Sequence, residues 1–216
     1  MSEDVKPSRR RYDASGRRAR AQQTRDEIAE TAKRLFVERG YGMTTIGDVA
    51  EATNVSPETI YKAFGSKRGL LDAAITASIR GDTRTIPLRG RSVVDAIRQE
   101  HDPRRQLEMY GNLLAEVNPR LAPLVRVMRE AASGDPDVAA ALTQLNAARL
   151  DGMAEFAALL AARGALRPGV SKAQAADVLW TLNSPEVYEL LVLDRRWNRR
   201  RYAQWIADQL ATALLD

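Results

Sequence analysis

Residues 44–67 read TTIGDVAEATNVSPETIYKAFGSK, and this stretch decides the fold. Its first part predicts a short helix with one apolar face, made by Ile46, Val49 and Ala50. Thr44 precedes that face and is a candidate N-cap. Asn54 follows the helix, and asparagine tolerates the left-handed backbone of a tight turn.

A second helix restarts immediately after the turn. Ser56, Pro57 and Glu58 supply a capping hydroxyl, a proline for the first helical position and an acid in the first turn. Ile60 and Phe64 lie four residues apart and face inward. The outward positions are Thr59, Tyr61, Lys62 and Ala63. Two helices joined by so short a turn predict a helix-turn-helix whose second helix fits a major groove.

The stretch resembles the DNA-binding domain of TetR-family transcriptional regulators. The shared motifs are LFVERGY (35–41), TTI (44–46), VAEATNVSPETIYKAF (49–64) and SKRGLL (66–71), within residues 22–80. Asn54 replaces the commoner glycine, and Ala63 stands where members often carry tyrosine or histidine. The resemblance implies a homodimer that binds double-stranded DNA at a pseudo-palindromic operator and takes a small-molecule effector.

Within this motif, certain side chains are candidates for DNA contact. Tyr61 and Lys62 extend beyond the inward-facing Ile60 and are long enough to meet phosphates or base edges. The hydroxyl residues can cap a helix, contact the backbone of DNA, or do both. The full set of predicted DNA-binding residues is Arg25, Thr44, Thr45, Ser56, Thr59, Tyr61, Lys62 and Lys67.

The N-terminal segment 1–21 is predicted to be a basic, disordered arm. Up to residue 25 the charged side chains are Lys6, Arg9, Arg10, Arg11, Arg17, Arg18, Arg20 and Arg25, against Glu3, Asp4 and Asp13. The whole formal charge of +5 therefore lies in this part of the chain. Such an arm can follow DNA phosphates or enter a minor groove, or it can serve only as a solubilising tail.

The rest of the chain also predicts helices and no strands. Helices are expected over 22–39, ending at Gly40, and over 67–80, followed by a connector at 81–91 and a second domain at 92–216. Helix starts are indicated at Asp102-Pro103, Asn118-Pro119, Asp135-Pro136 and Ser184-Pro185. Ser92 with Asp95 and Ser171 with Gln174 resemble capping boxes. The predicted fold is all-α: a three-helix helix-turn-helix domain, then a larger bundle for ligand binding and dimerisation.

Two apolar stripes in the second domain fit either an intramolecular core or a dimer seam. Helix 172–183 offers Ala175, Val178, Leu179 and Leu182, and helix 199–215 offers Tyr202, Ile206, Leu210 and Leu214. Periodicity alone does not separate the two uses. A basic cluster at Arg195, Arg196, Arg199, Arg200 and Arg201 indicates a solvated turn or a salt-bridged dimer edge.

The effector site is predicted from methionine, leucine and aromatic residues of the bundle. The candidates are Met109, Leu113, Met128, Phe156, Trp180 and Tyr188, with Tyr110 and Met153 as further cavity residues. At helical spacing, methionine and aromatic residues belong more often to plain helical core than to a ligand cavity. Nothing in the sequence indicates the chemistry of the effector.

Several classes of protein have no support. The chain of 216 residues has no cysteine and a single histidine, His101, so no metal site is predicted. A hydrolase triad and a nucleotide-binding glycine motif are also missing, so we expect no enzyme and no cofactor. Without a membrane-length apolar run or a secretory signal, a cytoplasmic protein is expected. The predicted function is a DNA-binding regulator, a repressor released by an effector, with an activator or a ligand-independent DNA-binding protein as alternatives.

Overall fold

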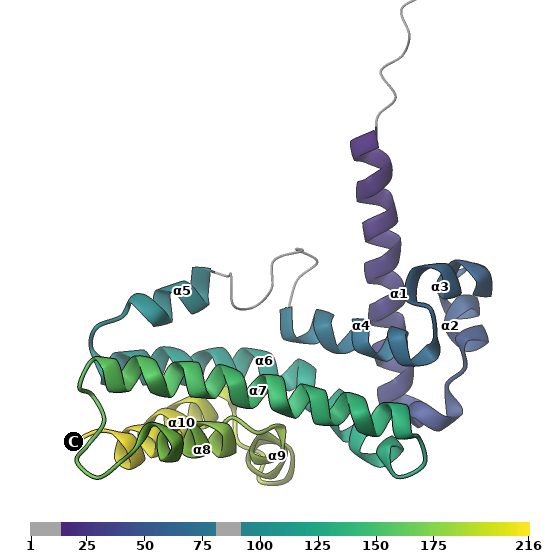
Figure 1. Cartoon of the computed structure of the whole chain (residues 1–216). Coiled ribbons are helices and arrows are strands. Elements are labelled where there is room, and N and C mark those ends of the chain that lie inside the picture. The colour runs from purple at the N-terminus through teal and green to yellow at the C-terminus, as the bar shows by residue number, and fades with distance from the viewer. Residues whose placement is uncertain (1–13, 81–91) are drawn as a thin grey trace, which may run out of the picture.

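The computed structural model describes residues 14–80 and 92–216, and all the regular elements in these ranges are helices (Figure 1). The all-α prediction is confirmed. The first four helices along the chain are α1 (Ala14–Met43), α2 (Ile46–Thr53), α3 (Pro57–Phe64) and α4 (Lys67–Arg80). Packing of α1 against α2 and α4 buries Ile28, Leu35 and Phe36, which lie on one apolar face of the helix.

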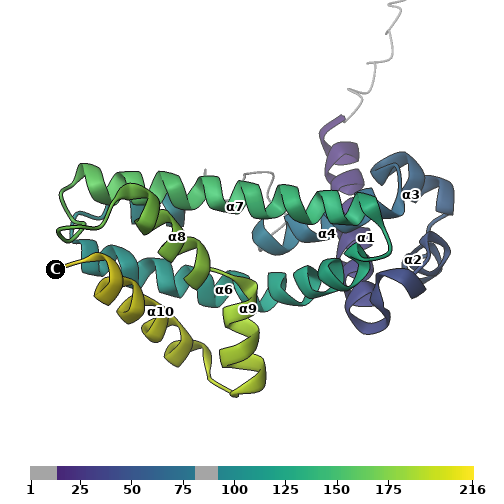
Figure 2. The same ribbon diagram turned by 60° about the horizontal axis from the view of Figure 1, so that its bottom comes forward.

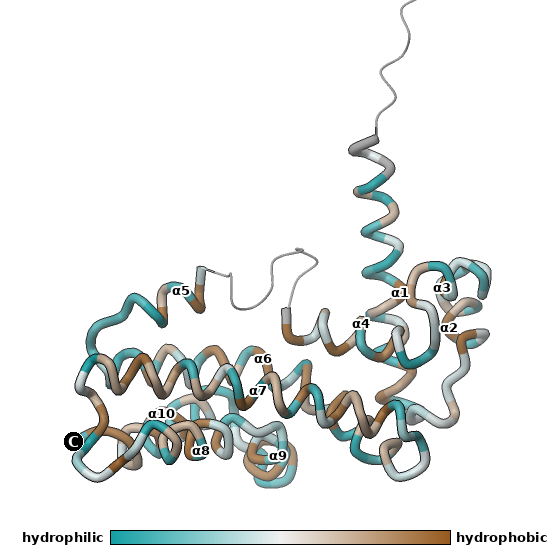
Figure 3. The backbone as a smooth tube through the Cα atoms, viewed as in Figure 1, coloured by the Kyte–Doolittle hydropathy of each residue, from teal (hydrophilic) through white to brown (hydrophobic). Residues whose placement is uncertain are grey.

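Helix α1 differs from its prediction at both ends. It begins at Ala14, so the part of the expected disordered arm between 14 and 21 is helical; residues 1–13 lie outside the described part. This start projects away from the other helices and is hydrophilic (Figures 1 and 3). Near the other end, Gly40 adopts φ 81° and ψ 161°, which no helix allows, so the regular helix does stop at the predicted glycine. A short turn then runs on to Met43.

The second domain is built around two long helices. They are α6 (Pro103–Ala132) and α7 (Pro136–Ala162), and α5 (Ser92–Gln99) packs on α6. The remaining elements are α8 (Lys172–Leu182), α9 (Pro185–Tyr188), the π-helical turn η2 (Glu189–Asp194) and α10 (Arg199–Leu214). Helix α8 packs chiefly on α7, α10 packs chiefly on α6, and α8 and α10 also touch each other (Figure 2). Within the described ranges no helix is long and apolar enough to cross a membrane.

Most of the predicted helix starts are confirmed by capping hydrogen bonds. Asp102, Asp135 and Ser184 each accept backbone N–H groups at the start of their helices, and each is followed by proline. Ser171 and Gln174 form the predicted capping box. The connector 81–91 lies outside the described residues, so its place between the domains stays a prediction.

The helix start predicted at Asn118-Pro119 is wrong. Pro119 and Pro123 both lie inside α6, which continues to Ala132. Asn118 is buried, and its amide donates to the Tyr202 hydroxyl at 2.9 Å instead of capping a helix. Tertiary packing of α6 against α10 therefore outweighs the local preference for a break.

The apolar stripe of α10 belongs to the core of a single chain. Tyr202, Ile206, Leu210 and Leu214 are all 0% exposed, and α10 packs chiefly on α6. The apolar stripe of α10 is therefore intramolecular core and not a dimer seam, because a residue buried in the monomer offers no surface to a partner. On α8, Ala175 and Leu179 are buried, whereas Val178 and Leu182 are only partly covered.

Candidate DNA-binding face and effector cavity

The turn between α2 and α3 is set by Asn54. This residue adopts φ 53° and ψ 41°, the left-handed conformation predicted for it. Its N–H donates to the carbonyl groups of Ala50 and Glu51, and the Val55 N–H donates to Ala50 O at 3.0 Å. These bonds satisfy the last carbonyls of α2 and turn the chain directly into α3.

Helix α2 is capped by Thr45, and the prediction that Thr44 caps it is wrong. Thr45 accepts the Asp48 N–H, and the Asp48 carboxylate in turn accepts the Thr45 N–H and hydroxyl, both at 2.7 Å. These hydrogen bonds hold the pKa of Asp48 below its usual value. Thr44 is fully buried, and its hydroxyl donates to the carbonyls of Leu35 and Gly40. Thr44 therefore fastens α2 to the end of α1 and is not placed to contact DNA.

Helix α3 presents three of the four outward side chains predicted for it, Thr59, Tyr61 and Lys62, whereas Ala63 is partly buried against the core. Ser56 caps the helix through the Thr59 N–H, and the two hydroxyls lie 3.1 Å apart. Tyr61 is 54% exposed, and Lys62 is exposed one residue further on. Ile60 and Phe64 are buried beneath them, as their spacing predicts. Four polar side chains thus share the free surface of a helix that is short and well anchored.

Two of the predicted cations are engaged by the protein itself. The Lys67 ammonium lies 4.2 Å from the centre of the Tyr41 ring and donates to Gly42 O at 3.4 Å. Partial burial lowers the pKa of Lys67. Arg25 donates to Ala63 O and stacks on the Phe64 ring at 4.5 Å. Both residues brace the ends of the helix-turn-helix, which is a structural role that sequence spacing did not reveal.

Helices α3 and α4 meet at a close contact over Gly69. A Cβ atom at this position would lie 2.0 Å from Phe64 O. Only glycine allows α4 to begin so near the last carbonyls of α3. The start of α4 therefore packs directly against the end of the recognition helix α3.

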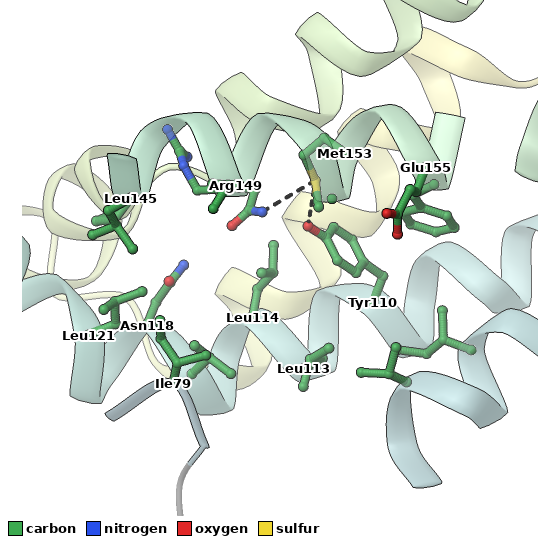
Figure 4. A pocket seen from close by; sticks show the side chains of 18 of the residues that line it. Ile79, Tyr110, Leu113, Leu114, Asn118, Leu121, Leu145, Arg149, Met153 and Glu155 are labelled. Atoms are coloured by element: carbon green, nitrogen blue, oxygen red, sulfur yellow. Dashed lines mark hydrogen bonds between the residues drawn. The ribbon is translucent and has the colours of Figure 1, made fainter. Parts of the chain in front are cut away.

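A cavity of about 530 Å³ lies in the second domain. Its wall is formed by residues of α5, α6 and α7, by Ile79 near the end of α4, by Asn183 just past α8 and by Pro185 at the start of α9. The volume is that of a small-molecule site. Figure 4 shows the side chains of α6 and α7 meeting across it.

The predicted effector residues divide into two groups. Leu113 and Phe156 line the cavity, as do Tyr110 and Met153. Met109, Met128, Trp180 and Tyr188 do not line it; Met128 and Tyr188 are buried in the core, and Trp180 stacks under the Arg149 guanidinium at 4.4 Å. Residue type alone does not separate a cavity wall from the core beside it.

The wall also contains residues that the sequence reasoning missed. On α7 they recur at helical spacing, as Leu145, Arg149, Gly152 and Leu159 do alongside Met153 and Phe156. That periodic face was a usable signal, because it predicts which side of α7 is turned to α6. Asn118 and Asn183, by contrast, are recognisable only once the helices are packed.

Comparison with known proteins agrees with the geometry of the helix-turn-helix. The family profile described as "Bacterial regulatory proteins, tetR family" matches residues 28–74, which run from α1 through α2 and α3 into α4. This part of the chain matches the TetR family. The matches indicate a TetR-family DNA-binding transcriptional regulator, and the resemblance stated from the motifs is confirmed.

Likeness to TetR-family proteins extends past the DNA-binding domain. The HTH-type transcriptional regulator YvkB of Bacillus subtilis is 25% identical over 161 residues, 74% of this chain and 78% of YvkB. NalD, the secondary repressor of the MexAB-OprM multidrug efflux pump in Pseudomonas aeruginosa, is 18% identical with a TM-score of 0.68, over 91% of this chain and 98% of NalD. SmeT in complex with triclosan is also 18% identical, with a TM-score of 0.64 over 90% and 92% of the two chains. At such identities the two structures show a shared TetR-family fold alone.

Proposed function

We propose that this TetR-family regulator is a repressor that leaves its operator when a small molecule fills the cavity of the second domain. The observation that carries the proposal is the position of α4. Its first turn is held against α3 at Gly69, and Ile79 near its other end lines the cavity. One helix therefore contacts both the recognition helix and the cavity wall.

Further contacts fix α4 to the second domain. Arg120 of α6 donates to Ser78 O at 3.0 Å, and Arg68 of α4 donates to Asp137 O of α7 at 2.8 Å. A molecule in the cavity that favours another packing of α6 and α7 would move these attachments. Release follows only if the effector binds the two arrangements with different affinity.

The cavity weighs against the ligand-independent alternative. A bundle needed only to hold two DNA-binding domains together would be solidly packed, because an internal void forfeits packing energy. An activator would share every residue of the DNA-binding face, so transcription assays separate it from a repressor. Two similar proteins have names that state repression: NalD is called a secondary repressor, and IcaR of Staphylococcus aureus is called a negative transcriptional regulator.

DNA contact is assigned to the exposed side chains of the helix-turn-helix. Tyr61 and Lys62 reach base edges or phosphates, while Thr45, Ser56 and Thr59 lie beside the N-termini of α2 and α3, which attract phosphate. The homodimer places two such helices in successive major grooves, about 34–36 Å or a multiple apart. The half-covered Val178 and Leu182 of α8 offer part of the dimer surface.

The test is a gel shift with DNA from the region upstream of the gene, in the presence of scrambled competitor and at several salt concentrations. We expect specific retardation by wild type. Lys62→Ala should weaken binding and lower the salt slope by about 1, because one phosphate contact is lost. Tyr61→Phe should weaken binding while the dimer stays intact in sedimentation. An unchanged affinity and salt slope for Lys62→Ala would show that α3 is not oriented toward DNA as proposed.

A further inference from the structure

The cavity contains one corner where hydrogen-bond donors outnumber good acceptors. The Tyr110 hydroxyl of α6 donates to the Met153 Sδ atom of α7 at 3.0 Å. The Asn183 side-chain amide, just past α8, donates to the same sulfur at 3.3 Å. Figure 4 shows the Tyr110 hydroxyl directed at the Met153 sulfur at the cavity wall.

A thioether sulfur is a weak acceptor for two donors in an apolar site. Burial raises the pKa of Tyr110 far above its ordinary value, so the phenol stays protonated and remains a donor. Among the described residues, neither group donates a hydrogen bond to any acceptor other than Met153. An oxygen acceptor placed in this corner would serve both donors better than the sulfur does.

The charged residues of the wall have protein partners, although the buried Nε atom of Arg149 has no hydrogen-bond partner among the described residues. Arg98 and Glu155 pair with each other at 3.4 Å. Arg149 donates to Trp180 O at 3.0 Å and stacks on the Trp180 ring. In Figure 4 the Arg149 guanidinium is directed away from Tyr110 and Met153. A formal charge on the ligand would therefore meet no free opposite charge in the Tyr110–Met153 corner, and burying it there would be costly.

We propose that the effector is an apolar molecule with an uncharged oxygen acceptor, such as a ketone, which takes the hydrogen bonds of Tyr110 and Asn183 from Met153. This assignment rests on the proposed function, because it assumes that the cavity is the effector site. The oxygen of the effector would thus lie where α6, α7 and the end of α8 meet. The apolar part of the effector would contact the rest of the cavity wall.

Two probes of nearly equal shape test the assignment. Benzophenone carries a ketone, and diphenylmethane lacks it; binding of each to the full chain is measured by calorimetry without DNA. Wild type should bind benzophenone about tenfold more tightly than diphenylmethane. Tyr110→Phe keeps the ring that packs on Phe156 but removes a donor, and should reduce this preference several-fold.

A second variant acts in the opposite direction. Met153→Leu removes the competing sulfur at similar volume, so it should increase the preference for the ketone. Tyr188→Phe is the matched control: Tyr188 is also a buried tyrosine of the bundle but does not line the cavity, so both affinities should stay unchanged.

Each alternative result is decisive. Equal binding of both probes by wild type, or a preference that Tyr110→Phe leaves intact, overturns the acceptor assignment and leaves the proposed function standing. No binding of either probe would remove the cavity as an effector site, and the assignment with it. Selective binding that never releases DNA in the gel shift would support the acceptor corner while contradicting the proposed release.

Discussion

Asn54 carries the backbone strain of the helix-turn-helix. At φ 53° a residue with a Cβ atom is strained, and asparagine is among those that accept this conformation most readily. We expect Asn54→Ala to lower the free energy of unfolding by about 1 kcal/mol, whereas Asn54→Gly should change it by less than about 0.5 kcal/mol. Urea denaturation of the three proteins measures this. Equal losses in both variants would mean that the asparagine side chain, not the backbone, matters.

Asp48 gives the DNA-binding domain a pH dependence of known sign. Its pKa is lowered in the folded chain by hydrogen bonds from Thr45. Its contribution to stability is therefore complete above the unfolded pKa of about 4 and is lost as the pH falls through the folded value. Asp48→Asn should be less stable than wild type at pH 7, and the difference should shrink below about pH 4. Denaturation curves at several pH values measure it, with Glu51→Gln, an exposed acid on the same helix, as the control.

At the scale of elements, the contact between α3 and α4 depends on one missing side chain. Gly69→Ala places a Cβ atom against Phe64 O, so the helices must separate. Overpacking of this kind costs about 1–3 kcal/mol, and we expect that loss together with weaker DNA binding. Gly134→Ala is the control, because a Cβ atom there meets nothing within 4 Å. A Gly69→Ala protein with wild-type stability and operator affinity would show that the joint is not tight.

The sequence predicted an element correctly where the interactions that form it lie within one helical turn, and failed where distant parts of the chain decide the structure. Ser56 and Pro57 lie at the start of α3 as predicted, because capping and proline chemistry act within one turn. Thr44 is predicted to cap α2, yet it is buried and Thr45 forms the cap, because the position of Thr44 depends on where α1 ends. Pro119 lies inside α6 because burial of the helix outweighs a proline break. The same limit applies to the cavity, where Leu113 and Met128 are alike in sequence and differ only in packing.

At the scale of the whole molecule, the proposed mechanism can be tested without an effector. Leu114 of α6 projects into the cavity, so Leu114→Trp should fill part of it and imitate occupancy (Figure 4). We expect operator affinity to fall about tenfold or more, which corresponds to about 1.4 kcal/mol. Leu150→Trp is the control, because Leu150 is an exposed residue of α7 outside the cavity. Wild-type operator affinity in a correctly folded Leu114→Trp dimer would contradict coupling between the cavity and the DNA-binding face.

The length of α4 has a mechanical consequence. Its 14 residues span about 21 Å, with the cavity at one end and the recognition helix at the other. Used as a lever, a helix of this length that tilts by about 5° about its cavity end carries its far end through roughly 2 Å. In a symmetric dimer the two displacements add, so the spacing of the heads changes by roughly 4 Å against a groove repeat of about 34 Å. A rearrangement too small to alter the fold would thus change the spacing of the two recognition helices enough that it no longer matches the spacing of successive major grooves.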